Sequence, residues 1–168
     1  EYIERNAANL AWIDAAFAHA REINAHGVVF FFQADLAYEK ENDVDARSGF
    51  NDTLNLFKRQ SIAFGKPVLL VGGDRHRLII DQPLIGPGRQ RIINVTRVMV
   101  HGDNDVHGTL IHVDTANPDL FSYQPVTIRE NMPAWKPAPK SQLQTRSGCC
   151  GERLLDFRHR FQRHAHRA

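Results

Sequence analysis

The chain has 168 residues, of which 42% are hydrophobic and 24% are charged. This length suits one domain with a sizeable hydrophobic core. The composition excludes several classes of protein. No apolar run approaches the roughly 20 residues of a membrane-spanning helix. No basic-then-apolar signal segment precedes Leu10. Two adjacent cysteines, Cys149 and Cys150, do not make a disulfide framework or, by themselves, a zinc site.

The net charge of +2 conceals two regions of opposite sign. Residues 129–168 hold nine basic and three acidic residues, a net charge of +6, whereas the other 128 residues hold 12 basic and 16 acidic residues, a net charge of −4. We therefore expect an acidic domain over 1–128 and a basic tail over 129–168. The prolines of the tail predict a segment that is largely disordered, with a short basic helix over 151–168. We favour an incidental extension over a nucleic-acid-binding arm.

The first predicted elements are an amphipathic helix and a buried strand. Apolar side chains recur every three or four residues over 6–24, which indicates a helix with one apolar stripe. Asn6 is the expected N-cap and Gly27 the expected stop signal. Residues 28–32 are all apolar, which is typical of a strand that is covered on both faces.

A second helix and a second buried strand follow after a polar, acidic loop over 36–48. Phenylalanine and leucine residues with helical spacing run from Phe50 to Phe64, and Gly65 is expected to close the helix. Pro67 precedes the strand at 68–71. Strand, helix and strand together predict a parallel β-α-β unit.

The remaining pattern is that of short strands and loops. A short strand is expected at 78–80, followed by a loop rich in proline and glycine. Residues 92–100 and 108–113 are predicted to form an antiparallel pair joined by a turn. After Pro118 the pattern fades, and no further strand is predicted.

Polar residues gather where the two parallel strands end. The first strand leads into Gln33-Ala34-Asp35, and the second leads into Gly72-Gly73-Asp74-Arg75-His76. The carboxyl ends of adjacent parallel strands lie at one edge of a sheet, so we expect these loops to be neighbours. Their amide oxygen, carboxylates and imidazole are all plausible metal ligands. The competing interpretation is that they are ordinary capping and loop residues.

Other polar residues are assigned simpler roles. We predict that Asp81 and Arg97 hydrogen-bond to each other as a structural pair between strand ends. We interpret His101, His107 and His112 as surface or loop residues, because the last two face opposite sides of a regular strand and cannot chelate one ion from it.

Several segments occur in an order that points to a known enzyme family. Together they resemble the C-terminal half of a bacterial branch of the calcineurin-like metallophosphoesterases. The resemblance covers roughly residues 1–128. It implies an α/β fold that is part of a four-layer α/β/β/α sandwich, with a mixed sheet of parallel and antiparallel strands. The matching segments are NLAWI at 9–13, QAD at 33–35, GKPVLLVGGDRHR at 65–77, IDQPL at 80–84 and TRV at 96–98.

The resemblance also implies a metal centre. The family's Gly-His-x-His motif matches Gly73-Asp74-Arg75-His76, so His76 is the first candidate metal ligand, and Asp74 stands where the family has its other histidine. Gln33 matches the position of a further metal-binding histidine. Manganese, iron or zinc ions are the implied cofactors. Arg75 and Arg77 are expected to bind the phosphate of the substrate, since arginine suits oxyanions.

The resemblance implies a phosphoesterase that uses metal-activated water, but it has an important gap. The family's earlier motifs, Asp-x-His, Gly-Asp-x-x-Asp and Gly-Asn-His, do not precede these segments in the chain. We therefore expect a truncated domain with an incomplete metal site. The alternative is a non-catalytic interaction fragment or a self-associating module, because half a sandwich leaves one sheet face uncovered and favours a homo-oligomer.

Overall fold

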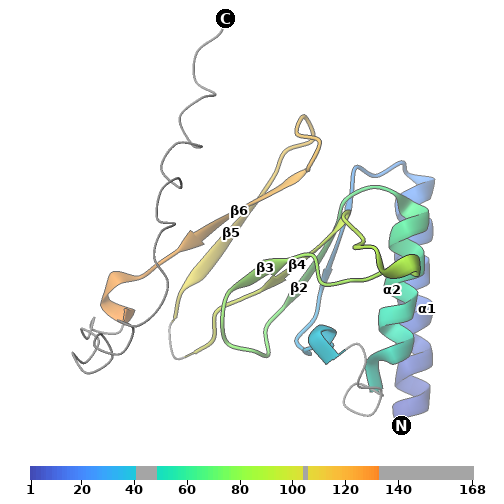
Figure 1. Ribbon diagram of the computed structural model, residues 1–168, viewed down its shortest axis with the longest axis horizontal. Coiled ribbons are helices and arrows are strands. Elements are labelled where there is room, and N and C mark those ends of the chain that lie inside the picture. The colour runs from blue at the N-terminus through green and yellow to red at the C-terminus, as the bar shows by residue number, and fades with distance from the viewer. Residues whose placement is uncertain (41–48, 104–105, 133–168) are drawn as a thin grey trace, which may run out of the picture. The chain divides into compact units, whose positions relative to one another are not determined.

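The computed structural model describes residues 1–40, 49–103 and 106–132, all of which belong to one unit, Glu1–Met132 (Figure 1). Among them no helix is both long and apolar enough to cross a membrane. Of the predicted tail, residues 129–132 are described and include a 3-10 helix. Its predicted disorder beyond Met132 and its helix at 151–168 concern residues outside the described ranges. Short 3-10 helices accompany the main elements, among them Tyr38–Lys40, Pro87–Arg89 and Arg129–Asn131.

The first helix, α1, spans Tyr2–Glu22 and begins earlier than its sequence pattern predicts. Its N-cap is Glu1, so the prediction that Asn6 caps it is wrong. Asn6 lies inside the helix, where its side chain donates a hydrogen bond of 3.0 Å to Asp52. The helix ends before Gly27 is reached, because Asn24 takes the left-handed conformation at φ 52°.

Gly27 has a different role from the predicted stop signal. A Cβ atom there would collide with the Leu120 side chain and would lie 2.7 Å from the carbonyl oxygen of Pro67. Only glycine permits this close approach, which brings the start of the sheet next to the segment before Phe121.

The second helix, α2, spans Asn51–Phe64 and ends as predicted at Gly65, whose φ of 65° is the left-handed conformation that favours glycine. The helix connects strands β1 (Val28–Phe31) and β2 (Val68–Gly72), which pair in parallel. The predicted β-α-β unit is therefore confirmed.

A four-stranded mixed sheet has the order β1-β2-β4-β3. Strand β4 spans Val95–Met99 and is parallel to β2, whereas β3, Ile79–Asp81, is antiparallel to β4. Strands β1, β2 and β4 consequently end at the same edge of the sheet, and β1 and β3 are the two outer strands.

A separate two-stranded hairpin corrects the predicted pairing of 92–100 with 108–113. Strand β5, Gly108–Val113, pairs antiparallel with β6, Phe121–Val126, which the sequence pattern did not reveal. Both sides of β4 are already occupied by β2 and β3, so β5 pairs elsewhere. In β6 the polar residues Ser122 and Gln124 alternate with Phe121 and Tyr123, and Pro125, an unusual strand residue, follows on the face of the two aromatic residues.

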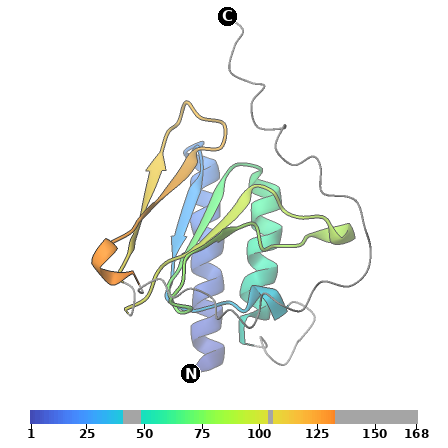
Figure 2. The same ribbon diagram turned by 60° about the vertical axis from the view of Figure 1, so that its left-hand side comes forward.

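Three layers result, with α1 and α2 on one face of the sheet and the hairpin on the other (Figures 1 and 2). Phe17, Phe57 and Leu70 belong to the core between helices and sheet. Leu69, Val98 and Phe121 belong to the core between sheet and hairpin. The fold class is thus α/β, with a mixed sheet and a second, two-stranded sheet.

Strand β1 is not covered on both faces, contrary to its prediction. Phe30 is 2% exposed and packs under the helices, but its neighbour Phe31 is 71% exposed. The other face of β1 is only half-buried at Val29, so the hairpin shields it incompletely. A continuous apolar run therefore did not distinguish an outer strand from a central one.

Candidate functional site

The candidate site lies at the edge where the three parallel strands end. The backbone N–H of Asp74 donates to the carbonyl oxygen of Gln33 at 3.2 Å, which confirms that the loops after β1 and β2 are neighbours. The N–H of Val100 donates to the carbonyl oxygen of Gly72 at 2.9 Å, so the loop after β4 lies beside them. Three loops, and not two, therefore form this edge.

Gln33 is held against the second loop. A Cβ atom on Gly73 would lie only 2.7 Å from the side-chain oxygen of Gln33. Gly73 thus leaves the space that the Gln33 amide fills, which is the close backbone approach that a glycine allows. Both Gln33 and Asp74 are exposed.

His76 connects the second loop to the third. Its backbone has a positive φ of 54°, and its N–H donates to the carbonyl oxygen of Gly73 at 3.2 Å. Its Nδ1 atom lies 3.2 Å from Oδ1 of Asp103, and its ring lies over Gly102, where any side chain would collide with it. Gly102 and Asp103 therefore place the loop after β4 against His76.

These donors do not make a complete metal centre by themselves. Within the described ranges, no three or more His, Cys, Asp or Glu side chains converge in a way that could hold a metal ion. His76 and Asp103 form a two-donor pair, and Gln33 and Asp74 lie on the neighbouring loops. Two divalent ions need more donors than this edge brings together.

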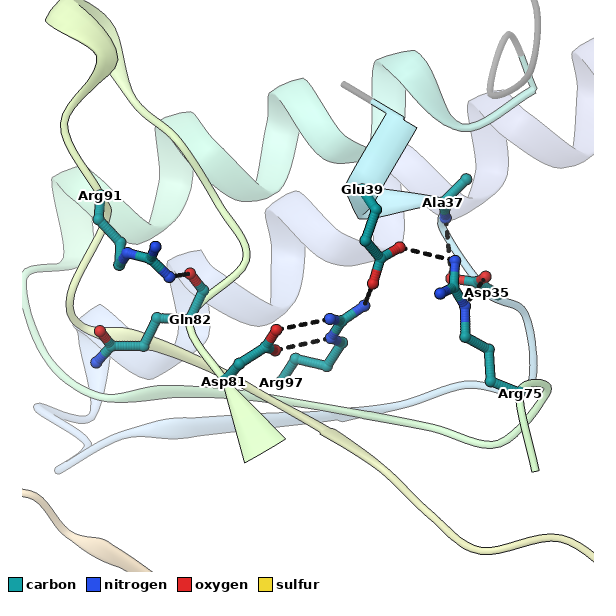
Figure 3. Close-up of polar contacts among 8 residues, drawn as sticks. All are labelled: Asp35, Ala37, Glu39, Arg75, Asp81, Gln82, Arg91 and Arg97. Atoms are coloured by element: carbon teal, nitrogen blue, oxygen red, sulfur yellow. Dashed lines mark hydrogen bonds and ion pairs between the residues drawn. The ribbon is translucent and has the colours of Figure 1, made fainter. Parts of the chain in front are cut away.

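Arg75 points away from this edge toward an ion-pair network, which Figure 3 shows. Its Nε donates to Oδ2 of Asp35 at 2.5 Å, and its Nη2 donates to Oε2 of Glu39 at 2.7 Å. Arg75 thereby ties the two neighbouring loops together. Arg77, the other predicted substrate-binding residue, is exposed.

Arg97 is the buried centre of the same network. Its side chain is 3% exposed and makes two hydrogen bonds to Asp81, of 2.8 Å and 2.7 Å, which confirms the predicted pair. It also donates to Oε1 of Glu39 at 2.8 Å and lies 4.8 Å from the centre of the Tyr38 ring. Glu39 therefore bridges two arginines, one with each of its oxygens (Figure 3).

The charges of this network shift the pKa values of its members. Burial alone would lower the pKa of Arg97, but its hydrogen bonds to Asp81 and Glu39 outweigh that effect and raise it. Burial would likewise raise the pKa of Glu39, but the hydrogen bond from Arg97 and the positive charges of both arginines lower it. Burial raises the pKa of Tyr38. Arg97 and Glu39 therefore both carry their charges at neutral pH. The network links β3, β4 and the loops after β1 and β2.

Two histidines that were interpreted separately lie in contact. The rings of His101 and His107 are 4.9 Å apart between centroids and nearly perpendicular. Nδ1 of His107 accepts a hydrogen bond of 3.2 Å from the backbone N–H of Ile128. Both are half-buried loop residues, whereas His112 is exposed on β5.

Sequence reasoning missed the third loop and its residues Gly102 and Asp103. It also missed Glu39, which looked like one of several acids in a solvated loop. The parallel pairing of β4 with β2 was the missing information, because it places the loop after Met99 at the same edge as the other two.

Comparison of the chain with family models, with curated proteins and with solved structures finds no match.

Proposed function

We propose that the chain forms part of a metal-dependent phosphoesterase, which hydrolyses a phosphoric ester with metal-activated water. In this proposal His76 is a metal ligand, Gln33 and Asp74 are weaker ligands, and Arg77 binds the phosphate of the substrate. Arg75 then acts indirectly, because its ion pairs with Asp35 and Glu39 fix the loops on which the ligands stand.

The meeting of three strand-end loops at one edge of the sheet is the observation that carries the proposal. Ligand-binding residues of α/β proteins gather at the carboxyl ends of parallel strands. Here that edge brings together an imidazole, an amide oxygen and carboxylates on adjacent loops. These are suitable donors for a divalent ion such as manganese, iron or zinc.

The proposed fold has one more layer than the three layers that the structure describes. A four-layer α/β/β/α sandwich would add a helical layer over the hairpin, where Leu110 is 50% exposed on the outer face. The remaining metal ligands would come from outside the described residues, since those within them do not complete a centre.

Calorimetric titration with Mn²⁺ tests the assignment of His76. We expect His76→Ala to weaken Mn²⁺ binding by at least about tenfold, because even the loss of a residue that only supports a metal ligand has an effect of that size. His112→Ala is the matched control, since His112 is exposed on β5 and belongs to none of the three loops. Equal binding by the wild-type chain and His76→Ala would remove His76 from the proposed site.

A turnover assay with p-nitrophenyl phosphate and Mn²⁺ separates an enzyme from a non-catalytic module. Manganese-dependent hydrolysis that His76→Ala abolishes would support a catalytic role for this chain. If the wild-type chain binds Mn²⁺ without turnover, the ligand assignment stands, but hydrolysis by this chain alone is contradicted.

A further inference from the structure

Strand β1 presents an open backbone edge. The N–H group of Val28 donates to the carbonyl oxygen of Pro67, just before β2, and the N–H group of Phe32 donates to that of Val71 in β2, at 3.0 Å each. Backbone groups alternate in direction along a strand, so the N–H and C=O groups of Val29 and Phe31 point away from β2. In the sheet order β1-β2-β4-β3, no described strand lies on that side.

Within the described ranges, this edge lacks several of the features that normally prevent strands from pairing, although the strand is short. Residues 28–32 contain no charge and no proline, and β1 pairs with β2 residue for residue without a bulge. Natural outer strands are usually protected by such features or are covered by other segments. An unprotected apolar edge is therefore suited to pairing with another strand.

The surface beside this edge is apolar and hollowed. A groove of about 720 Å³ runs between α1, the start of α2 and β1, and its lining includes Trp12, Phe31 and Phe50. Trp12 is 61% exposed although its ring packs edge-on against Phe30 at 5.8 Å, and Phe31 is 71% exposed. Large aromatic side chains on both faces of β1 thus remain in contact with water.

We propose that β1 pairs antiparallel with β1 of a second copy of this chain, around a two-fold axis at Phe30. In this register Val29 of one copy lies opposite Phe31 of the other, and the reverse pair follows by symmetry. Because both residues direct their backbone groups outward, the two pairs form four hydrogen bonds and use every outward group of the strand. The two sheets become one continuous sheet of eight strands.

A second copy fits this edge because the strand is complementary to itself. On the helix side, Phe30 lies opposite its own equivalent, each ring remaining buried in its own copy, and Val28 lies opposite Phe32. On the hairpin side, each Phe31 packs against Val29. Every cross-strand pair is apolar, so no charge is brought opposite a like charge. A two-fold axis also gives a closed dimer and leaves no further strand edge at β1.

The dimer is independent of the proposed metal site. Antiparallel pairing directs the carboxyl ends of the two β1 strands in opposite directions, so the loops that carry His76 lie at opposite ends of the joined sheet. His76→Ala is therefore expected to leave association unchanged, and the two proposals can fail separately.

Sedimentation velocity of the full chain over a range of concentrations tests the dimer. We expect a monomer–dimer equilibrium whose dissociation constant rises by about tenfold or more in Phe31→Pro, because two of the four hydrogen bonds lose their donors. The N–H of Phe31 makes no bond to β2, so proline is tolerated there. Phe31→Lys provides a second test by placing a charge in the apolar interface, and Ile93→Lys, at a residue 74% exposed elsewhere, is its control.

Amide hydrogen exchange locates the interface. Protection of the Val29 and Phe31 amides should increase with protein concentration in the wild-type chain and should not increase in Phe31→Lys. A wild-type chain that stays monomeric at all concentrations would overturn the proposal. So would a dimer that both Phe31 variants leave intact while circular dichroism shows that they are folded.

Discussion

The two outer strands of the sheet differ in how their edges are closed. Strand β3 has only three residues, and its last residue, Asp81, holds the buried guanidinium of Arg97. Strand β1 has four residues, all of them apolar, and no charged group at its edge. One outer strand is thus short and anchored to its neighbour by charge, whereas the other is wholly apolar, and of these two, within the described residues, only the apolar strand lacks a charged side chain.

The two outer strands also contribute to stability in different ways. The ion pairs of β3 face the helix side of the sheet, where Tyr38 covers Arg97. In β1 the helix-side residue Phe30 is fixed by three aromatic neighbours, whereas Phe31 on the opposite face is exposed. We therefore expect one face of β1 to maintain the fold and its other face and edge to be available for binding.

The largest expected effect on stability comes from Phe30 of β1, and its neighbour Phe31 serves as the control. Phe30→Ala should lower the free energy of unfolding by about 3–5 kcal/mol, because a buried ring is replaced by a cavity. Phe30 contacts the rings of Phe17 and Phe57 at centroid distances of 5.2 Å and 5.0 Å. Phe31→Ala should change the free energy by no more than about 0.5 kcal/mol, since its side chain is exposed in the monomer.

Urea unfolding at a concentration where the chain is monomeric measures both values. A comparable loss of stability in the two variants would show that the hairpin side of β1 is covered, and the contrast between the two edges of the sheet would disappear.

The charged edge should give the next largest effect. Asp81→Ala is expected to cost about 3 kcal/mol, because it removes one partner of a buried charge and leaves Arg97 with Glu39 alone. Glu22→Ala is the control. It removes a contact with His19 in which the two side chains are 67% and 78% exposed, and such surface contacts contribute at most about 1 kcal/mol.

Thermal or urea unfolding checks this prediction, and sedimentation velocity adds a second criterion. Asp81→Ala should leave association at β1 unchanged. If both substitutions cost the same, the network around Arg97 would contribute no more than a surface ion pair.

The smallest expected effect is a dependence of stability on pH. The folded-state pKa of Glu39 lies below its ordinary value of 4.5. Stabilisation by this carboxylate is therefore complete above that value and is lost as the pH falls through the lower, folded-state pKa. Glu39 is 43% exposed, so we expect a contribution of no more than about 1 kcal/mol.

The measurement compares the wild-type chain with Glu39→Gln in urea unfolding between pH 7 and pH 3. The difference in stability should be constant near neutral pH and should shrink in acid. A difference that stays constant down to pH 3 would contradict the lowered pKa of Glu39.

Much of the local structure could be predicted from sequence. The apolar spacing before Phe64 and the glycine at 65 predicted α2 and its end. The apolar run at 68–71 predicted a fully buried strand, and β2 is buried at every position. These features depend on neighbouring residues, and helical periodicity and left-handed glycine are local properties.

The partners of the strands could not be predicted in the same way. Residues 92–100 have the composition of a strand, but no local signal specifies that β4 lies between β2 and β3. The run at 28–32 looked like a central strand and is an outer one. Of the candidate site, the proximity of the first two loops followed from parallel pairing, whereas Gly102 and Asp103 depended on the placement of β4.

The sequence by itself determined the two helices, most of the strands and the division of charge between residues 1–128 and 129–168. It suggested the Asp81–Arg97 pair, which the structure confirms. Only the tertiary structure decided that three loops meet at one edge, that Glu39 bridges Arg75 and Arg97, and that β1 has an open side. The physical reason is that propensity and periodicity act over a few residues. Strand order, by contrast, depends on which apolar faces can be buried together across the whole chain.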